Sequence, residues 1–181
     1  MWRTNETQSE RLEIDMSSYP IGDKLIAFIK KVSLFYNAQD EVISRLAGIT
    51  VITNYKAQET IINNGAIGHT MYIIFSGTLK VHDDEHQVAL LEKGEFFGEL
   101  SILDSEPRSM SVSAVTEATL GSIDRKSFYE VLEQFPEMTK YIIAALNKRL
   151  RGQNEVLISE FKSREEQLQD LVISGNCSNT S

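Results

Sequence analysis

One short stretch of the chain carries residue types that can bind an anion. It runs from Phe97 to Ser109 and contains a glycine, an acidic residue and an arginine, Gly98, Glu99 and Arg108. The glycine allows close backbone approach, and the residues after it can form a short helix whose N–H groups face outward. The planar fork of an arginine suits phosphate oxygens. The stretch therefore indicates a site for an anionic ligand.

Arg108 is expected to point into the protein. From Arg108 onward the sequence alternates, with Met110, Val112 and Ala114 on one side and serines on the other, as in a β-strand. An inward arginine is costly to bury without a partner, so an anionic group should meet it. Glu99 can pair with Arg108, or it can accept a hydrogen bond from a ligand hydroxyl. Both arrangements remain open at this stage.

The elements around this stretch predict an α+β fold. From about residue 49, short β-branched and aromatic runs alternate with glycines and polar turns, which is typical of an antiparallel β-barrel or jelly roll. Helical spacing of apolar residues predicts helices from Asp23 to Phe35, after Asn37 and after Asp124. The expected strands are Ile49–Thr53, Thr60–Ile62, Met71–Phe75, Thr78–His82, Gln87–Leu91, Ser109–Val115 and Ala118–Ile123.

A long helix is expected over residues 136–172, after the domain at 22–135. Its apolar residues follow spacings of three and four, with Gln153 filling a polar slot between Leu150 and Leu157. Such a narrow stripe is typical of a helix that pairs with a partner. Two partners fit the stripe, a second copy of the chain or the chain's own barrel. The polar segments 1–21 and 173–181 are expected to be a flexible arm and tail. The stripe consists of Ile143, Leu146, Leu150, Leu157 and Phe161.

Charge and hydropathy argue against several classes of function. Lys and Arg total 18 and Asp and Glu total 26, a net charge of −8 that disfavours DNA binding. The residues after Phe161 also lack a basic recognition helix. No apolar run approaches the roughly 20 residues of a membrane span, and the N-terminus has no signal-peptide core. We therefore expect a cytoplasmic protein without membrane insertion.

A metal enzyme is the alternative that the histidines raise. Cupins are also small β-barrels, and they bind metal through clustered histidines and a glutamate. Here His82 and His86 stand four residues apart across an expected turn, and His69 is remote in sequence. Cys177 is the one cysteine of the chain, which leaves no cysteine-rich metal site. No metal is expected, and the histidines are interpreted as surface residues of a hairpin.

The stretch from Gly98 to Ser109 resembles the phosphate-binding cassette of cyclic nucleotide-binding domains. This family includes the bacterial catabolite regulator and the regulatory subunit of protein kinase A. The match has no insertion or deletion: Phe-Gly-Glu-Leu, a small residue, a short helix, then Pro-Arg and a small residue. The resemblance extends over roughly residues 22–155, including Asn64-Gly65 and Ser76-Gly77. It implies a sensor domain that binds cAMP or cGMP.

The resemblance also implies roles for individual residues. Arg108 would bind the exocyclic oxygens of a 3′,5′-cyclic phosphate, and Glu99 would accept the ribose 2′-hydroxyl. Gly98, Ser101 and Ser109 would supply backbone groups nearby. The sugar and base would be lined by Val81, Val88, Phe97, Leu100 and Val112, and the base would be capped by Gln153 and Asn154 of the long helix.

Binding without turnover is the expected chemistry. The cassette contains no nucleophile–base pair and no metal cluster, so no catalysis is expected. The signal would pass through the long helix to an effector protein that the sequence does not identify, with a homodimer through that helix as one arrangement. The alternative is a degenerate barrel that serves only as an interaction module, with Glu99 and Arg108 paired internally.

Overall fold

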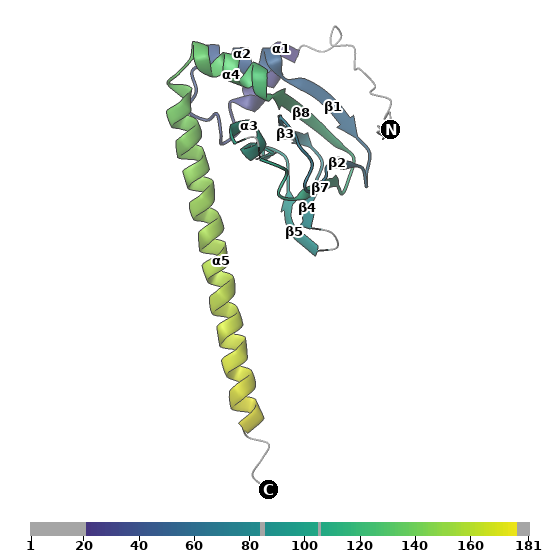
Figure 1. The fold of residues 1–181 in the computed structure, drawn as a ribbon, viewed down its shortest axis with the longest axis vertical. Coiled ribbons are helices and arrows are strands. Elements are labelled where there is room, and N and C mark those ends of the chain that lie inside the picture. The colour runs from purple at the N-terminus through teal and green to yellow at the C-terminus, as the bar shows by residue number, and fades with distance from the viewer. Residues whose placement is uncertain (1–20, 84–85, 105, 177–181) are drawn as a thin grey trace. The chain divides into compact units, whose positions relative to one another are not determined.

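The computed structural model describes residues 21–83, 86–104 and 106–176 (Figure 1). The predicted arm falls almost entirely outside these residues, as does the end of the predicted tail with Cys177. The chain divides into two compact units after Tyr141. The first unit contains all the strands and the helices α1 to α4, and the second contains most of α5.

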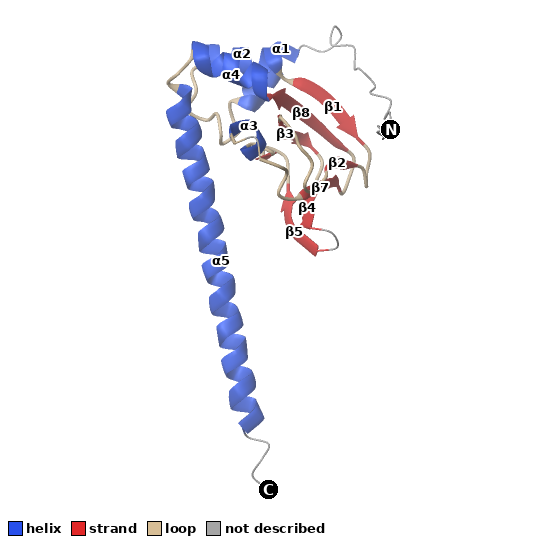
Figure 2. Cartoon of the chain, in the orientation of Figure 1, coloured by secondary structure: helices blue, strands red, loops and turns tan. Residues whose placement is uncertain are grey.

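Two antiparallel sheets of four strands each form the body of the first unit (Figure 2). The strand order is β1-β8-β3-β6 in one sheet and β2-β7-β4-β5 in the other. This arrangement confirms the predicted α+β jelly roll with N-terminal helices and a long C-terminal helix. The strands are β1 (Val51–Tyr55), β2 (Thr60–Ile62), β3 (Thr70–Ser76), β4 (Leu79–Asp83), β5 (His86–Leu91), β6 (Phe96–Phe97), β7 (Ser111–Ala114) and β8 (Ala118–Asp124).

The core of the jelly roll is made by side chains from both sheets. The ring of Tyr72 stacks on Phe97, with 5.0 Å between ring centroids, and both belong to or pack against the buried cluster. Removing these side chains from water is the main force that holds the two sheets together. The buried cluster consists of Ile62, Ile74, Leu79, Leu91, Phe97, Val112, Ala114, Ala118 and Leu120.

Helices close one side of the jelly roll, where α1 and α4 both pack on α2. Phe28 of α1 meets the edge of Phe75 in β3, with ring centroids 4.9 Å apart. Phe75 in turn lies over Gly121 of β8, where a Cβ would be only 2.6 Å from its ring. The helices of the first unit are α1 (Ile21–Ile29), α2 (Asp40–Ile49), α3 (Leu100–Leu103) and α4 (Arg125–Gln134).

All seven predicted strands are present with ends within two residues of the prediction, and the first of them spans Val51–Tyr55 instead of Ile49–Thr53. The first helix ends at Ile29 instead of Phe35, because the apolar residues that follow are buried in successive turns with i to i+3 hydrogen bonds such as Phe35 N–H to Val32 O. The strand predicted from Ser109 begins at Ser111. The two-residue strand β6 was not predicted, since a run this short has no readable alternation.

The helix α5 runs from Met138 to Asn176, a length of 39 residues. It begins two residues after the predicted start and continues past the predicted end at residue 172. Many of its described side chains are exposed, including Ile143, Leu150 and Phe161. Among the described helices, none combines the length and the apolar character that crossing a membrane requires.

Candidate functional site

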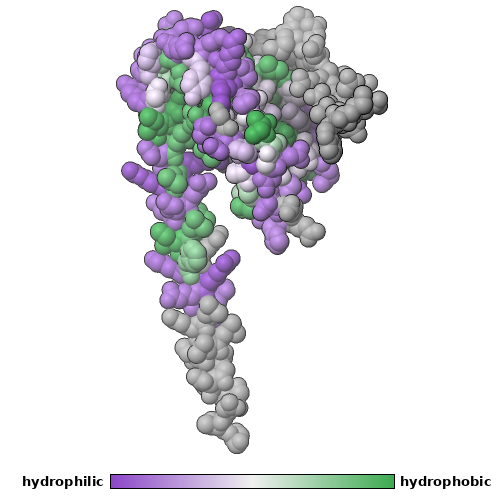
Figure 3. All heavy atoms as spheres, in the orientation of Figure 1, coloured by the Kyte–Doolittle hydropathy of each residue, from purple (hydrophilic) through white to green (hydrophobic). Residues whose placement is uncertain are grey.

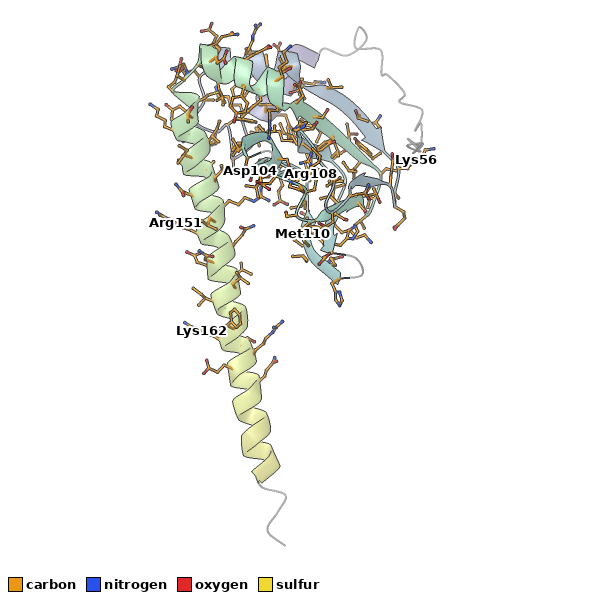
Figure 4. All side chains as sticks on the ribbon, viewed as in Figure 1. Lys56, Asp104, Arg108, Met110, Arg151 and Lys162 are labelled. Atoms are coloured by element: carbon orange, nitrogen blue, oxygen red, sulfur yellow. The ribbon has the colours of Figure 1, made fainter. Side chains whose placement is uncertain are left out.

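Arg108 is buried, with 7% of its surface exposed. Its Nη1 donates a hydrogen bond to the carbonyl oxygen of Gly98 at 3.1 Å, and its Nη2 donates to the carbonyl oxygen of Thr70 at 2.6 Å. Gly98 precedes α3, and Thr70 begins β3. The guanidinium, labelled in Figure 4, is therefore held between the cassette and the start of a central strand.

Two glycines provide the space for this guanidinium. A Cβ on Gly68 would lie 2.6 Å from Arg108 Nε and 2.7 Å from Nη2, and a Cβ on Gly98 would lie 2.6 Å from Nη1. Gly98 also has a φ of +74°, a conformation that favours glycine. Any other residue at either position would collide with the arginine, so the pair of glycines fixes where the charge can sit.

The burial of Arg108 does not arise from strand alternation, as the sequence interpretation assumed. Arg108 precedes β7, and residues 109 and 110 form a bend. Its backbone is instead paired with the loop between β2 and β3. The Arg108 N–H donates to Ala66 O at 2.9 Å, and the Gly65 N–H donates to Arg108 O at 2.7 Å. This pairing turns the side chain toward Gly68 and Thr70.

Burial sets the electrostatics of the site. It lowers the pKa of the Arg108 guanidinium below its ordinary value, while coulombic interactions with Tyr72 and with the carboxylate of Glu99 act to raise this pKa. An arginine remains protonated in proteins even so. The site therefore contains a desolvated positive charge with the half-buried Glu99 beside it.

The other predicted cassette residues differ in their exposure. Ser101 is buried in α3, and Ser109 is exposed on the bend before β7. Leu100, the first residue of α3, is 54% exposed. The cassette thus exposes the apolar side chain of Leu100 directly before the buried Ser101.

The predicted lining residues fall into two groups. Phe97 and Val112 belong to the buried cluster between the sheets, and Val81 packs against that cluster while half-buried. Val88 is 63% exposed, in the part of β5 that faces an irregularity of the pairing with β4. The structure therefore shows Val88 as accessible surface and Phe97 and Val112 as core.

Gln153 and Asn154 lie on α5, in the second unit, and both are exposed. Their predicted contact with a bound base stays a prediction.

The histidines do not form a metal centre in the described part of the chain. No group of three or more His, Cys, Asp or Glu side chains there is arranged to hold a metal ion. His82 is half-buried, and its Nε2 forms a hydrogen bond of 2.9 Å with Ser113 Oγ. His86 is exposed on β5, opposite Asp83. His82 is thus part of the polar surface of a sheet and more enclosed than the sequence interpretation assumed.

Sequence reasoning missed three residues that shape the site. Gly68 and Thr70 contact the guanidinium directly, and Tyr72 raises its pKa against the effect of burial. All three are about 40 residues before Arg108, in the loop after β2 and in β3. Gly68 lies in a segment that the sequence predicts to be a turn. Its glycine was therefore explained by the turn, and nothing local indicated its contact with Arg108.

Comparison with known proteins identifies the family of this fold and site. Residues 52–135 match the family model described as "Cyclic nucleotide-binding domain". This range includes the cassette, both sheets apart from the first residue of β1, and α4. The chain therefore carries a cyclic nucleotide-binding domain and resembles both catabolite-regulator-type proteins and the regulatory domains of cyclic nucleotide-dependent kinases.

Two curated relatives and one solved structure illustrate the likeness. The chain is 35% identical over 106 residues to the cGMP-dependent protein kinase of Plasmodium berghei, covering 59% of this chain and 12% of the kinase. It is 27% identical over 140 residues to the CRP-like cAMP-activated global transcriptional regulator of Mycobacterium tuberculosis, covering 75% of this chain and 61% of the regulator. It therefore spans only part of these two proteins.

The solved structure is the N-terminal domain of a transcriptional regulator from Streptomyces coelicolor A3(2). It superimposes with a TM-score of 0.62 at 26% identity, covering 72% of this chain and 94% of that domain.

Proposed function

We propose that this domain is a non-catalytic sensor of a 3′,5′-cyclic nucleotide, cAMP or cGMP. The observation that carries the proposal is the buried guanidinium of Arg108, held by two carbonyl oxygens in a space made by two glycines. Carbonyl oxygens orient a guanidinium without neutralising it, so a buried arginine gains from an anionic ligand. A cyclic phosphate is a compact anion that meets this requirement, and Arg108 is the residue that binds its exocyclic oxygens.

Glu99 is the residue that we assign to the ribose 2′-hydroxyl. It follows Gly98 directly, and its half-buried carboxylate opposes the lowering of the pKa of Arg108 by burial. An ionised carboxylate accepts hydrogen bonds and cannot donate them. Glu99 therefore favours a ligand that places a hydroxyl beside its phosphate, as a ribose does.

We assign apolar side chains of α3, β4 and β5 to the sugar and the base. Leu100 and Val88 are both more than half exposed, and Val81 is half-buried. Covering such side chains with a nucleoside gains about 25 cal/mol per Å² of apolar surface. Val81 packs against the buried cluster that contains Phe97 and Val112, and we assign backbone groups of Gly98, Ser101 and Ser109 to the phosphate.

For α5 we propose signal transmission to an effector and pairing with a second copy of the chain. Ile143, Leu150, Leu157 and Phe161 follow spacings of seven, seven and four, and each is at least half exposed. Figure 3 shows hydrophobic areas in green along the long helix, between hydrophilic areas in purple. Spacings that repeat every seven residues place the side chains on one stripe, as in a coiled coil. Gln153 and Asn154 are proposed to reach the base from this helix.

Calorimetric titration with cAMP and with cGMP tests the sensor. We expect one nucleotide to bind, and Arg108→Leu to weaken binding at least about 30-fold, the usual loss when one partner of a buried charge pair is removed. Arg45→Leu is the matched control, because Arg45 is exposed on α2, and it should bind as the wild type does. A wild type that binds neither nucleotide at about 1 mM would contradict the proposal, since even a dissociation constant of that size corresponds to only about 4 kcal/mol of binding free energy. That result would favour a domain that serves only as an interaction module.

The role of Glu99 has its own test. The wild type should bind the natural nucleotide better than its 2′-deoxy analogue, and Glu99→Ala should bind both equally, because the hydroxyl then has no carboxylate to meet. Equal binding of the two ligands by the wild type would contradict the assignment of Glu99 and leave that of Arg108 intact.

A further inference from the structure

Arg125, the first residue of α4, makes two hydrogen bonds to segments that lie far from it in sequence. Its side-chain Nη2 donates to the carbonyl oxygen of Ser101 in α3. Its backbone N–H donates to the carbonyl oxygen of His69, in the loop before β3, at 2.7 Å. One residue therefore ties both the cassette helix and the loop between β2 and β3 to the start of α4.

The same two segments hold Arg108. Gly98 and Thr70 accept its side-chain hydrogen bonds, and they lie three residues before Ser101 and one residue after His69. Arg108 thus forms hydrogen bonds to the cassette and to the start of β3. Arg125 forms hydrogen bonds to the same two segments from the start of α4. A shift of either segment must therefore change the contacts of both arginines.

The cassette helix depends on such an external bond. α3 contains only four residues, too few for intrahelical hydrogen bonds to hold it by themselves. Ser101 is buried, and its carbonyl oxygen receives a charge-assisted hydrogen bond, the stronger kind. The guanidinium of Arg125 thus helps to hold α3 in position, together with the buried side chain of Ile102.

The other end of this connection is held by a helix cap and by packing. Asp124 caps α4 by accepting hydrogen bonds from the N–H of Ser127 at 3.0 Å and from its hydroxyl at 2.6 Å. The first turn of α4 is therefore fixed where Arg125 leaves it, and α4 packs on α2. A displacement of the cassette would therefore act, through Arg125, on the first turn of α4.

We propose that Arg125 is a positioning residue of the ligand site, which holds the cassette in its binding geometry and transmits occupancy of the site to α4. The inference rests on the proposed function, in that the occupant is a cyclic nucleotide. Arg125 acts through Ser101 and His69 and does not itself contact the ligand.

Hydrogen exchange of the ligand-free protein tests the connection without any nucleotide. Arg125→Gln should increase exchange at least tenfold in residues 98–104, while the core strand β8 exchanges as in the wild type. Lys126→Gln is the matched control, since Lys126 is exposed in the same helical turn, and it should leave exchange in the cassette unchanged. Unchanged exchange of the cassette in Arg125→Gln would overturn the proposal.

Nucleotide binding provides the second readout. Arg125→Gln should weaken binding about tenfold, as expected for loss of one charged hydrogen bond, and should abolish the nucleotide-induced change of exchange in α4. Arg125→Lys should restore part of the affinity, because lysine can still donate one bond to Ser101.

Wild-type affinity in Arg125→Gln, or a wild-type response of α4, would overturn the positioning role. A wild-type protein that binds neither nucleotide would overturn the proposed function instead, and exchange in the ligand-free protein would still decide whether Arg125 holds the cassette.

Discussion

Gly68 lies directly against the guanidinium of Arg108. A Cβ built on Gly68 would be 2.6 Å from Nε, 2.7 Å from Nη2 and 2.9 Å from Cζ of that side chain. No methyl group fits at these distances, so the arginine occupies its present position only because residue 68 has no side chain. The two residues are 40 positions apart in the sequence.

Gly68→Ala should therefore separate ligand binding from stability. The new methyl group collides with the end of a flexible side chain, which can swing away, so the unfolding free energy should change by less than about 1 kcal/mol. Nucleotide affinity should fall at least tenfold because the guanidinium is displaced. Calorimetric titration and urea unfolding measure the two effects.

The control for this change is Gly48→Ala. A Cβ at Gly48 meets nothing within 4 Å, and the residue lies in α2. This variant should gain up to about 1 kcal/mol of stability from helix propensity and bind as the wild type does. Wild-type affinity in Gly68→Ala would contradict the proposed dependence of binding on the arginine's position.

Gly77→Ala should be far more destabilising than either of these. Gly77 has a φ of +91°, and a Cβ there would be 2.5 Å from Glu117 O and 2.7 Å from Ala118 Cα, which are backbone atoms that cannot swing aside. We expect a loss of more than about 2 kcal/mol in the unfolding free energy.

Gly65→Ala separates the two causes of that loss. Gly65 has a similar φ of +74°, with nothing within 4 Å of a Cβ, so it carries the backbone strain alone, about 1–2 kcal/mol. Urea unfolding should rank the wild type above Gly65→Ala and Gly65→Ala above Gly77→Ala. Equal stability of the two variants would show that the collision with β8 is relieved.

The fold could be predicted from the sequence because its signals are local. The run Met71–Phe75 is rich in β-branched and aromatic residues, and Gly77 and Gly94 mark turns with positive φ on either side of the β4–β5 hairpin. Each of these signals can be read within a few residues. Apolar residues that pack in irregular turns, as Phe35 does, have no such pattern, which is why the first helix was predicted too long.

The site was predicted in part, and one step of the reasoning was wrong. Arg108 is buried as expected, but the strand that was to turn it inward starts three residues later. The true causes are the absence of a side chain at Gly68 and the carbonyl oxygen of Thr70. Both depend on how distant loops come together in the fold, and neither spacing nor periodicity reports such contacts. The same holds for the bond from Arg125 to Ser101.

Asp124→Ala should make the stability of the first unit less dependent on pH. Hydrogen bonds from the hydroxyl and the backbone of Ser127 hold the pKa of Asp124 below its ordinary value. Such a carboxylate stabilises the folded state above the unfolded pKa of about 3.9, and this contribution is lost as the pH falls through the lower folded-state pKa.

Near pH 7 we expect Asp124→Ala to lose about 1 kcal/mol, the usual value of an N-cap. The difference from the wild type should shrink as the pH falls below about 4. Asp124→Asn keeps a capping oxygen and should behave as the wild type does near pH 7. Urea unfolding at several pH values measures this, and a constant difference between wild type and Asp124→Ala would contradict the role of the charge.

The proposed pairing of α5 with a second copy predicts a dimer in solution that depends on the apolar stripe. Leu150 and Leu157 are 55% and 50% exposed and lie two helical turns apart on that stripe. Leu150→Glu with Leu157→Glu places like charges opposite each other in a coiled coil and should give monomers by analytical ultracentrifugation. Arg151 and Lys162, labelled in Figure 4, lie off the stripe and would remain in solvent.

Val156→Glu is the control that tests whether position on the helix matters. Val156 is as exposed as these leucines, at 56%, but it lies one residue before Leu157 and so about 100° around the helix from it. This variant should remain dimeric, because an exposed charge outside the seam meets only water. A wild type that is monomeric at about 100 μM would contradict the pairing, because its free energy of association would then be weaker than about 5 kcal/mol. A monomeric Val156→Glu would show that the contact between the helices does not follow this stripe.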